Sequence, residues 1–376
     1  MTNKLNKLIN ELCHDGVEFK ELGQLAKIGT GSSNGNEAIE NGKYPFFVRS
    51  KIVKSLNSFE FDEEAIIIPG EGGIGEIFHY INGKYALHQR AYRIHFLTKG
   101  ISTKFAYYYL FANFLPYILK KSVNATVKSI RKPMIETFPI PLPPLPIQEE
   151  IVRILDNFTE LEAELEAELE ARKKQYEYYR NEMLSFGDDV EFKELGEVCS
   201  DIFAGGDRPK IYKKGQTEPS EEFPYPIFSN GTDKQALYGY SKDYKVDKEA
   251  VTISARGTIG FHTVRKPKFT PIIRLIVLIP DKNQITTKFL NYVLDITEIG
   301  HSGGSIPQLT TPNVKKIKIP VPSIPEQNRI VSILDKFDAL VNDISIGLPA
   351  EIKARRKQYE YYREKLLTFK EAENVM

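Results

Sequence analysis

Polar side chains on predicted turns have the chemistry needed to contact DNA. Reading a DNA sequence requires cations for phosphate oxygens and forked or amide side chains for base edges. Such residues follow a Tyr-Pro motif in each half of the sequence, and others lie on glycine-bounded loops or just before proline-rich segments. The candidate DNA-binding residues are Arg49, Ser50, Lys51, Gln89, Arg90, Lys128, Arg131, Lys132, Ser229, Asn230, Arg256, Thr258, Ser305 and Gln308.

Each candidate also has an ordinary structural interpretation. The residues after the Tyr-Pro motifs, at 49–51 and 229–230, are equally compatible with solvated loops. Arg256 would contact a phosphate or a guanine edge, or else satisfy carbonyl groups of its own domain. The glycines of residues 70–75 indicate a turn, because no Lys-Ser/Thr pair follows them as in a phosphate-binding loop.

The sequence lacks the motifs of the enzymes that act on DNA. It has no Asn/Asp-Pro-Pro-Tyr/Phe string to hold a flipped adenine, no glycine-rich turn for S-adenosylmethionine, no GxxxxGK[ST] loop and no HExxH helix. Its six histidines form no credible triad with a serine or cysteine nucleophile. Cys13 and Cys199 belong to no CxxC motif or Cys/His cluster. We therefore expect neither a catalytic site nor a metal site in this chain.

Composition indicates a globular protein of more than one domain. The 376 residues are 41% hydrophobic and 27% charged, and no apolar run approaches the ~18 residues that would span a membrane. The N-terminus lacks the features of a secretory signal, so we expect a cytoplasmic protein. The net charge of +1 conceals an uneven distribution: Lys+Arg against Asp+Glu is 18 to 13 in residues 1–147, 5 to 11 in 148–186 and 19 to 17 in 187–325.

The chain contains a tandem repeat of about half its length. The string VEFKELG at residues 17–23 returns unchanged at 190–196. Residues 140–158 match 319–337 at 11 of 19 positions, and residues 171–180 match 354–363 at nine of ten. The stretches between these strings match only at scattered points. Each half therefore consists of a globular domain, a proline-rich connector and a helix, with most divergence in the globular domain.

The helices predict how the two halves are arranged. Residues 148–186 contain no proline or glycine and carry apolar residues at three- and four-residue spacing, which predicts a helix roughly 58 Å long. A second helix over 326–369 should break or kink at residues 347–349, Gly-Leu-Pro. A long helix with one apolar seam needs a partner, and the duplicate helix, packed antiparallel, is the obvious one. The acidic run at 162–170 is most simply a solvated surface.

Taken together, the motifs resemble the DNA-specificity subunits of type I restriction-modification systems over essentially the whole chain. The strings that carry the resemblance are GSIPQL at 304–309, IPVPSIPEQ at 319–327, IVSILD at 330–335 and, upstream, SARGTIG at 254–260. The first copy departs from them, with GEGGIG at 70–75 and Ile147-Gln148 where Glu326-Gln327 stands.

The resemblance implies both a fold and partners. The expected α+β fold has two similar mixed α/β target-recognition domains, at 1–147 and 187–325, separated by two long spacer helices, at 148–186 and 326–376, which form an antiparallel coiled coil with pseudo-two-fold symmetry. Such a subunit is non-catalytic and reads a bipartite target in double-stranded DNA. It binds two methyltransferase subunits and, through them, the restriction or motor subunits. S-adenosylmethionine, ATP and Mg are expected in those partners and no cofactor in this chain, and no membrane is involved.

Two other functions remain open on the sequence alone. A two-lobed protein-interaction scaffold is compatible with the mild charge, and a stand-alone enzyme with an unrecognised site is a weaker alternative. Neither explains why the domain interiors diverged while the connectors and helices stayed alike. Strong salt dependence and a two-part sequence preference would favour DNA reading.

Overall fold

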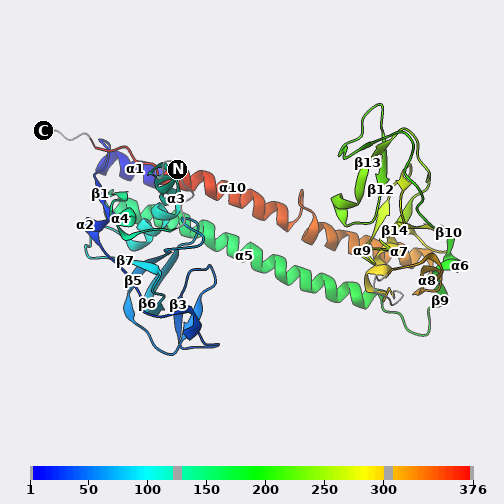
Figure 1. Ribbon diagram of the computed structural model, residues 1–376, viewed down its shortest axis with the longest axis horizontal. Coiled ribbons are helices and arrows are strands. Elements are labelled where there is room, and N and C mark those ends of the chain that lie inside the picture. The colour runs from blue at the N-terminus through cyan, green and yellow to red at the C-terminus, as the bar shows by residue number, and fades with distance from the viewer. Residues whose placement is uncertain (1–2, 122–128, 300–307, 373–376) are drawn as a thin grey trace. The chain divides into compact units, whose positions relative to one another are not determined.

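The computed structural model describes residues 3–121, 129–299 and 308–372, which fall into two compact units. Unit 1 is Met1–Glu166 with Glu351–Met376, and unit 2 is Ala167–Ala350. Each unit contains one globular domain, here called the first and the second lobe, and parts of the long helices (Figure 1). Within the described ranges, no helix is both long and apolar enough to cross a membrane.

The first lobe is built on a six-stranded sheet in the order β2-β7-β5-β6-β3-β4, in which only β3 and β6 pair in parallel. Successive side chains of a strand face opposite sides of the sheet. Ile66 and Ile68 of β5 accordingly pack with Phe105 of α3, whereas Ile67 packs with Tyr85 in a second cluster. The bounds are β2 Ala26–Thr30, β3 Tyr44–Phe47, β4 Lys54–Leu56, β5 Phe61–Pro69, β6 His79–Leu87, β7 Ala91–Phe96 and α3 Thr103–Lys121.

The second lobe repeats this plan with its sheet divided in two. One sheet has the order β10-β17-β14-β15 and the other the order β11-β13-β12-β16. Where β6 is continuous in the first lobe, the second lobe has β15 and β16, separated by a turn in which Lys268 has a φ of 70°. The bounds are β10 Cys199–Ala204, β11 Tyr212–Lys214, β12 Tyr225–Phe228, β13 Leu237–Ser241, β14 Ala250–Ile253, β15 His262–Arg265, β16 Thr270–Pro271, β17 Ile276–Pro280 and α7 Thr287–Ile296.

The repeated strings pair with each other inside each lobe. The VEFKELG string forms β1 (Phe19–Glu21) in the first lobe and β9 (Phe192–Glu194) in the second, and the proline-rich connector forms β8 (Pro139–Pro141) and β18 (Lys318–Pro320). β1 pairs with β8, and β9 with β18, in two-stranded antiparallel sheets that tolerate proline. The connectors are thus extended, as predicted. The short helices nearby are α1 Asn3–Leu12, α2 Leu22–Leu25, α4 Lys132–Glu136, α6 Leu195–Val198 and α8 Thr311–Lys315.

Three long helices follow the connectors: α5 (Leu145–Leu184), α9 (Ile324–Asn342) and α10 (Leu348–Leu366). α5 begins three residues before its predicted start, because a proline is accommodated in the first helical turn, as Pro146 is here. The predicted break in the second helix is confirmed, but Pro349 lies in the first turn of α10 rather than at a kink. The break itself covers residues 343–347, where Asp343 accepts a 2.7 Å hydrogen bond from the N–H of Ser345.

The long helices pack pairwise within each unit. In unit 1, α10 runs antiparallel to the first part of α5, because Phe158 stacks on Tyr362 with centroids 5.5 Å apart while Glu162 accepts a hydrogen bond from Arg356. In unit 2, Tyr179 of α5 stacks on Phe337 of α9 at 5.9 Å. The predicted domain boundaries at 147, 186 and 325 lie within three residues of an end of α5 or α9, and those at 147 and 325 fall just inside these helices. The division into compact units cuts through α5 and α10 instead, so the boundaries stay a prediction.

The sequence predicted that the acidic run on α5 is a solvated surface. The structure shows that it also takes part in helix pairing. Glu162 and Glu166 both bond to Arg356 of α10, so two of its carboxylates serve helix pairing. Glu168 lies 3.3 Å from the Arg172 guanidinium, one turn along the same helix. The regular Glu spacing could not reveal this, because the partner arginine is almost two hundred residues away in the chain.

Candidate DNA interface

The loops that carry the predicted contact residues are held by the same backbone hydrogen bonds in both lobes. Before β7, the N–H of His88 donates to the carbonyl of Phe47 at 2.9 Å. Before β17, the N–H of Ile272 donates to Phe228 at 2.8 Å. Two further bonds recur, from Gln89 to Ser33 and from Ile130 to Gly70 in the first lobe, and from Ile273 to Gly206 and from Leu309 to Ala255 in the second.

These matched bonds give a residue-by-residue equivalence between the lobes. Counting along the chain from the bonded residues, Arg49 is equivalent to Asn230, Glu71 to Arg256 and Arg90 to Arg274. Ser129, which precedes Ile130, is equivalent to Gln308. The backbone frame is therefore shared while most of the side chains on it differ.

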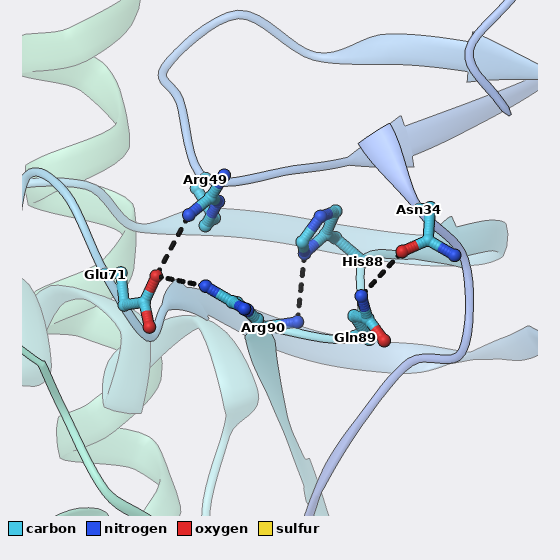
Figure 2. A network of polar contacts seen from close by, with 6 residues as sticks. All are labelled: Asn34, Arg49, Glu71, His88, Gln89 and Arg90. Atoms are coloured by element: carbon cyan, nitrogen blue, oxygen red, sulfur yellow. Dashed lines mark hydrogen bonds and ion pairs between the residues drawn. The ribbon is translucent and has the colours of Figure 1, made fainter. Parts of the chain in front are cut away.

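In the first lobe, two arginines converge on one carboxylate. Nη1 of Arg49 and Nη1 of Arg90 donate to the same oxygen, Oε2 of Glu71, at 2.9 and 3.0 Å (Figure 2). The three side chains remain 45%, 57% and 37% exposed, respectively. The Arg90 guanidinium, with a further contribution from Arg49, holds the pKa of Glu71 below its usual range. Glu71 is thus ionised at neutral pH and keeps two like-charged side chains together.

A second pair of polar contacts stands beside this cluster. Nε2 of Gln89 donates to Oδ1 of Asn34 at 2.6 Å, and the backbone N–H of Arg90 donates to Nδ1 of His88 at 2.9 Å (Figure 2). Burial lowers the pKa of His88, with smaller contributions from Arg49 and Arg90. A neutral His88 ring can accept the bond from Arg90, so it helps to orient that residue.

In the second lobe, two arginines converge on one amide. Nη2 of Arg256 and Nη1 of Arg274 lie 3.1 and 3.0 Å from Oε1 of Gln308. Arg274 has a φ of 67°, a left-handed conformation that few residues other than glycine adopt. Each lobe therefore holds two guanidinium groups around one side-chain oxygen. Two of the three positions in each cluster are equivalent between the lobes, those of Arg90 and Arg274 and those of Glu71 and Arg256.

Other predicted contact residues have structural partners. Asn230 donates from Nδ2 to the carbonyl of Ile273 at 3.0 Å and accepts from the N–H of Ala255 at 2.8 Å, which fixes the loop. Its DNA contact stays a prediction. Ser50 donates to the carbonyl of Ile52 at 2.9 Å, and Ser229 to that of Asn230 at 3.3 Å.

Four further predicted residues, which the structure describes, lie outside the two clusters. Lys51 and Arg131 are exposed, and Nζ of Lys132 lies 3.3 Å from Glu136 on α4. The hydroxyl of Thr258 is buried and finds no hydrogen-bond partner among the residues described. Lys128 and Ser305 lie outside the described residues.

Arg274 and Glu71 are the two cluster residues absent from the candidates predicted from the sequence. Arg274 could have been found by aligning it with Arg90, since each stands just before an apolar strand, but the neighbouring residues share no identity. Glu71 was missed because only cations and forked or amide side chains were considered as DNA contacts, and its glycine-rich surroundings indicated no more than a turn. Within the described part of the chain, no group of three or more His, Cys, Asp or Glu side chains is arranged to hold a metal ion.

Comparison with known proteins identifies the family. A family model described as the type I restriction modification DNA specificity domain matches residues 14–171 and again residues 187–354. A type I specificity subunit of Mycoplasma pneumoniae is 34% identical over 331 residues, which cover 84% of this chain and 96% of that relative. The chain belongs to the type I restriction-modification DNA specificity family.

Solved structures show the same fold in other type I specificity subunits. The crystal structure of the S subunit from M. genitalium matches with a TM-score of 0.58 at 19% identity, covering 93% of this chain and 95% of that one. A chain from a study of complex assembly and conformational transition of the type I system also matches at 0.58, with 16% identity and coverage of 94% and 97%. The predicted fold of two similar mixed lobes and long helices is thereby confirmed. Each family match spans one lobe, its connector and part of a long helix, so this specificity subunit has two recognition domains.

Proposed function

We propose that this specificity subunit reads a two-part sequence in double-stranded DNA, one part with each lobe, and carries out no reaction itself. The supporting observation is the pair of arginine clusters at equivalent places in the two lobes. Guanidinium groups make the forked hydrogen bonds that recognise guanine edges, and they also bind phosphates. A shared frame with different side chains is what two readers of different sequences require.

We further propose that the long helices act as a spacer that leaves the intervening base pairs unread. The 40 residues of α5 correspond to a helix about 60 Å long. Half-sites about one DNA turn apart, ~34 Å, would place both lobes on the same face of the duplex. Inserting four residues between Glu160 and Glu170 should change the number of unread base pairs, whereas the length-preserving substitution Glu164→Gln should not. An unchanged spacing after the insertion would contradict this role.

The partners are proposed from the family. A study of complex assembly of the type I system includes a chain with this fold. We propose that this subunit likewise assembles in the cytoplasm with two methyltransferase subunits, which would bind S-adenosylmethionine. Restriction or motor subunits, with ATP and Mg, would join through them.

The test is the methylated motif produced by this chain with its methyltransferase. Methylation-sensitive sequencing of DNA from cells that express both should reveal a two-part motif. The double variant Arg49→Ala/Arg90→Ala should lose or relax one half, and Arg256→Ala/Arg274→Ala the other. Lys282→Ala, an exposed lysine beyond the far end of β17, is the control and should leave the motif intact.

Two outcomes would count against the proposal. If both double variants left the motif unchanged, the arginine clusters would not be the readers. If the wild-type complex methylated no two-part motif and bound DNA without sequence preference, the interaction-scaffold alternative would gain support.

A further inference from the structure

The two arginine clusters differ in charge at the atom on which they converge. In the first lobe this atom belongs to the carboxylate of Glu71, and in the second to the neutral amide of Gln308. Two arginines and one glutamate leave the first cluster with a formal charge of +1, whereas the second cluster has +2. Because a carboxylate close to a phosphate is repelled by it, the first cluster is the less suited of the two to bind the DNA backbone.

The hydrogen-bonding groups of the first cluster match the edge of a G·C pair in the major groove. Guanine presents two acceptors there, N7 and O6, and cytosine presents the N4 amino donor. Arg49 and Arg90 each use one guanidinium nitrogen, Nη1, in the contact with Glu71. A guanidinium has five N–H donors, so further donors on each arginine are available for other contacts. Among the described residues, no donor reaches the second carboxylate oxygen of Glu71, Oε1. The cluster thus offers forked donors beside an acceptor.

We propose that Arg49, Glu71 and Arg90 form a reader of a G·C base pair, in which Glu71 is the specificity-determining residue. The arginines bond to guanine, and Glu71 holds them in place, accepts from cytosine N4 and disfavours phosphate contacts. The side chains are exposed enough to reach DNA, while His88 and the frame hydrogen bonds fix the loop from which Arg90 projects (Figure 2). This inference rests on the proposed function and deepens it.

Modified duplexes test the reader directly. The probe is a DNA duplex that contains the sequence motif recognised by the complex of this chain with its methyltransferase, and binding of that complex to the duplex is measured. Replacing the guanine by 7-deazaguanine removes N7, and we expect roughly five- to hundredfold weaker binding, the range for one forked contact. Replacing the cytosine by 2-pyrimidinone removes the N4 amine and should weaken binding of the wild type but not of Glu71→Ala. Inosine keeps N7 and O6 and serves as the control, since it should bind like guanine.

Variants separate specificity from charge. Glu71→Gln should relax the requirement for G·C in one half-site and leave the other half-site unchanged. Glu76→Gln removes the same charge from the same loop but has no arginine partner among the described residues, so the motif should persist. Equal effects of the two variants on both half-sites would show a general charge effect and overturn the inference.

Failure of the inference and failure of the proposed function give different results. If the wild-type complex recognises no two-part sequence, the proposed function fails. If it recognises one, but 7-deazaguanine is tolerated in the half-site that Arg49→Ala/Arg90→Ala relaxes, or Glu71→Ala leaves the motif unchanged, the function stands and the G·C reader does not. A uniform loss of affinity in Arg90→Ala for all sequences, with a shallower salt dependence, would show that the cluster binds phosphate.

Discussion

Replacing Gln148 by leucine should loosen the attachment of the first lobe to α5. The side chain is fully buried and makes three hydrogen bonds to backbone. Oε1 accepts from the N–H of Ser102 at 2.8 Å, and Nε2 donates to the carbonyls of Gly100 and Pro143 at 3.0 and 2.7 Å. A net stabilisation of about 1 kcal/mol for each hydrogen bond gives a loss of about 3 kcal/mol in the free energy of unfolding. The loss is larger where the backbone groups stay buried without a partner.

The second lobe supplies a matched experiment in the same chain. Gln327 is also fully buried, and it bonds to the N–H of Thr286 at 2.8 Å and to the carbonyls of Gln284 and Pro322 at 2.8 and 2.9 Å. Hydrogen exchange followed by mass spectrometry reports each lobe separately. A loss of about 3 kcal/mol corresponds to roughly hundredfold faster exchange where local opening limits it.

The expected pattern is specific to the lobe that is changed. Gln148→Leu should accelerate exchange around Ser102 and leave the segment around Thr286 protected, and Gln327→Leu should do the reverse. Gln24→Leu, at an exposed position, should change unfolding by less than about 0.5 kcal/mol. The reasoning is refuted if both buried variants behave like Gln24→Leu, or if either one loosens both lobes equally.

Three further predictions concern stability. Glu63→Ala should destabilise the first lobe by about 3–5 kcal/mol in urea unfolding, because it leaves the buried Arg93 guanidinium, now 2.7 Å from Glu63, unpaired. The guanidinium of Arg153 and the Lys4 ammonium lower the pKa of Glu150 to about 2. This carboxylate should therefore stabilise the fold above about pH 4.5 and lose its contribution as the pH falls toward 2. Glu150→Gln should remove that pH dependence in acid unfolding. Ile147→Glu should lower the melting temperature, because Ile147 is fully buried, whereas Glu326→Ile at the equivalent, partly exposed position should not.

The last of these comparisons also explains a departure visible in the sequence. Ile147 stands where the second half has Glu326, and it lies in the same core cluster as Leu5 of α1. Lys4 of α1 bonds at 2.8 Å to Glu150, one turn further along α5. The N-terminal helix thus contributes to the core of the first unit near the start of α5, where an apolar residue is favoured. No periodicity within residues 3–12 could have indicated which part of the chain this helix would meet.

The sequence predicts the architecture well because that architecture depends on local patterns. Apolar spacing and the absence of proline predict α5, and Gly347 and Pro349 predict the break before α10. The repeat predicts two similar lobes. The clusters depend on contacts between residues distant in the chain, such as Glu71 with Arg49 and Arg90, and no local pattern encodes these. Prediction therefore identified Arg49, Arg90, Arg256 and Gln308 of the clusters but missed Arg274 and Glu71, whose carboxylate gathers the first pair of arginines. Their contact with DNA stays a prediction.

The side-chain contacts shared by the two halves lie where each lobe meets its helix, and the differing side-chain contacts lie at the loops. Asp156 on α5 bonds to Lys104 and Tyr108 of α3, and Asp335 on α9 bonds in the same way to Lys288 and Tyr292 of α7. With the buried glutamines, these ties fix a lobe to its helix without involving any residue of the arginine clusters. A change at the clusters therefore need not alter how the lobe is held. This separation accounts for two halves that kept one frame while their loops diverged.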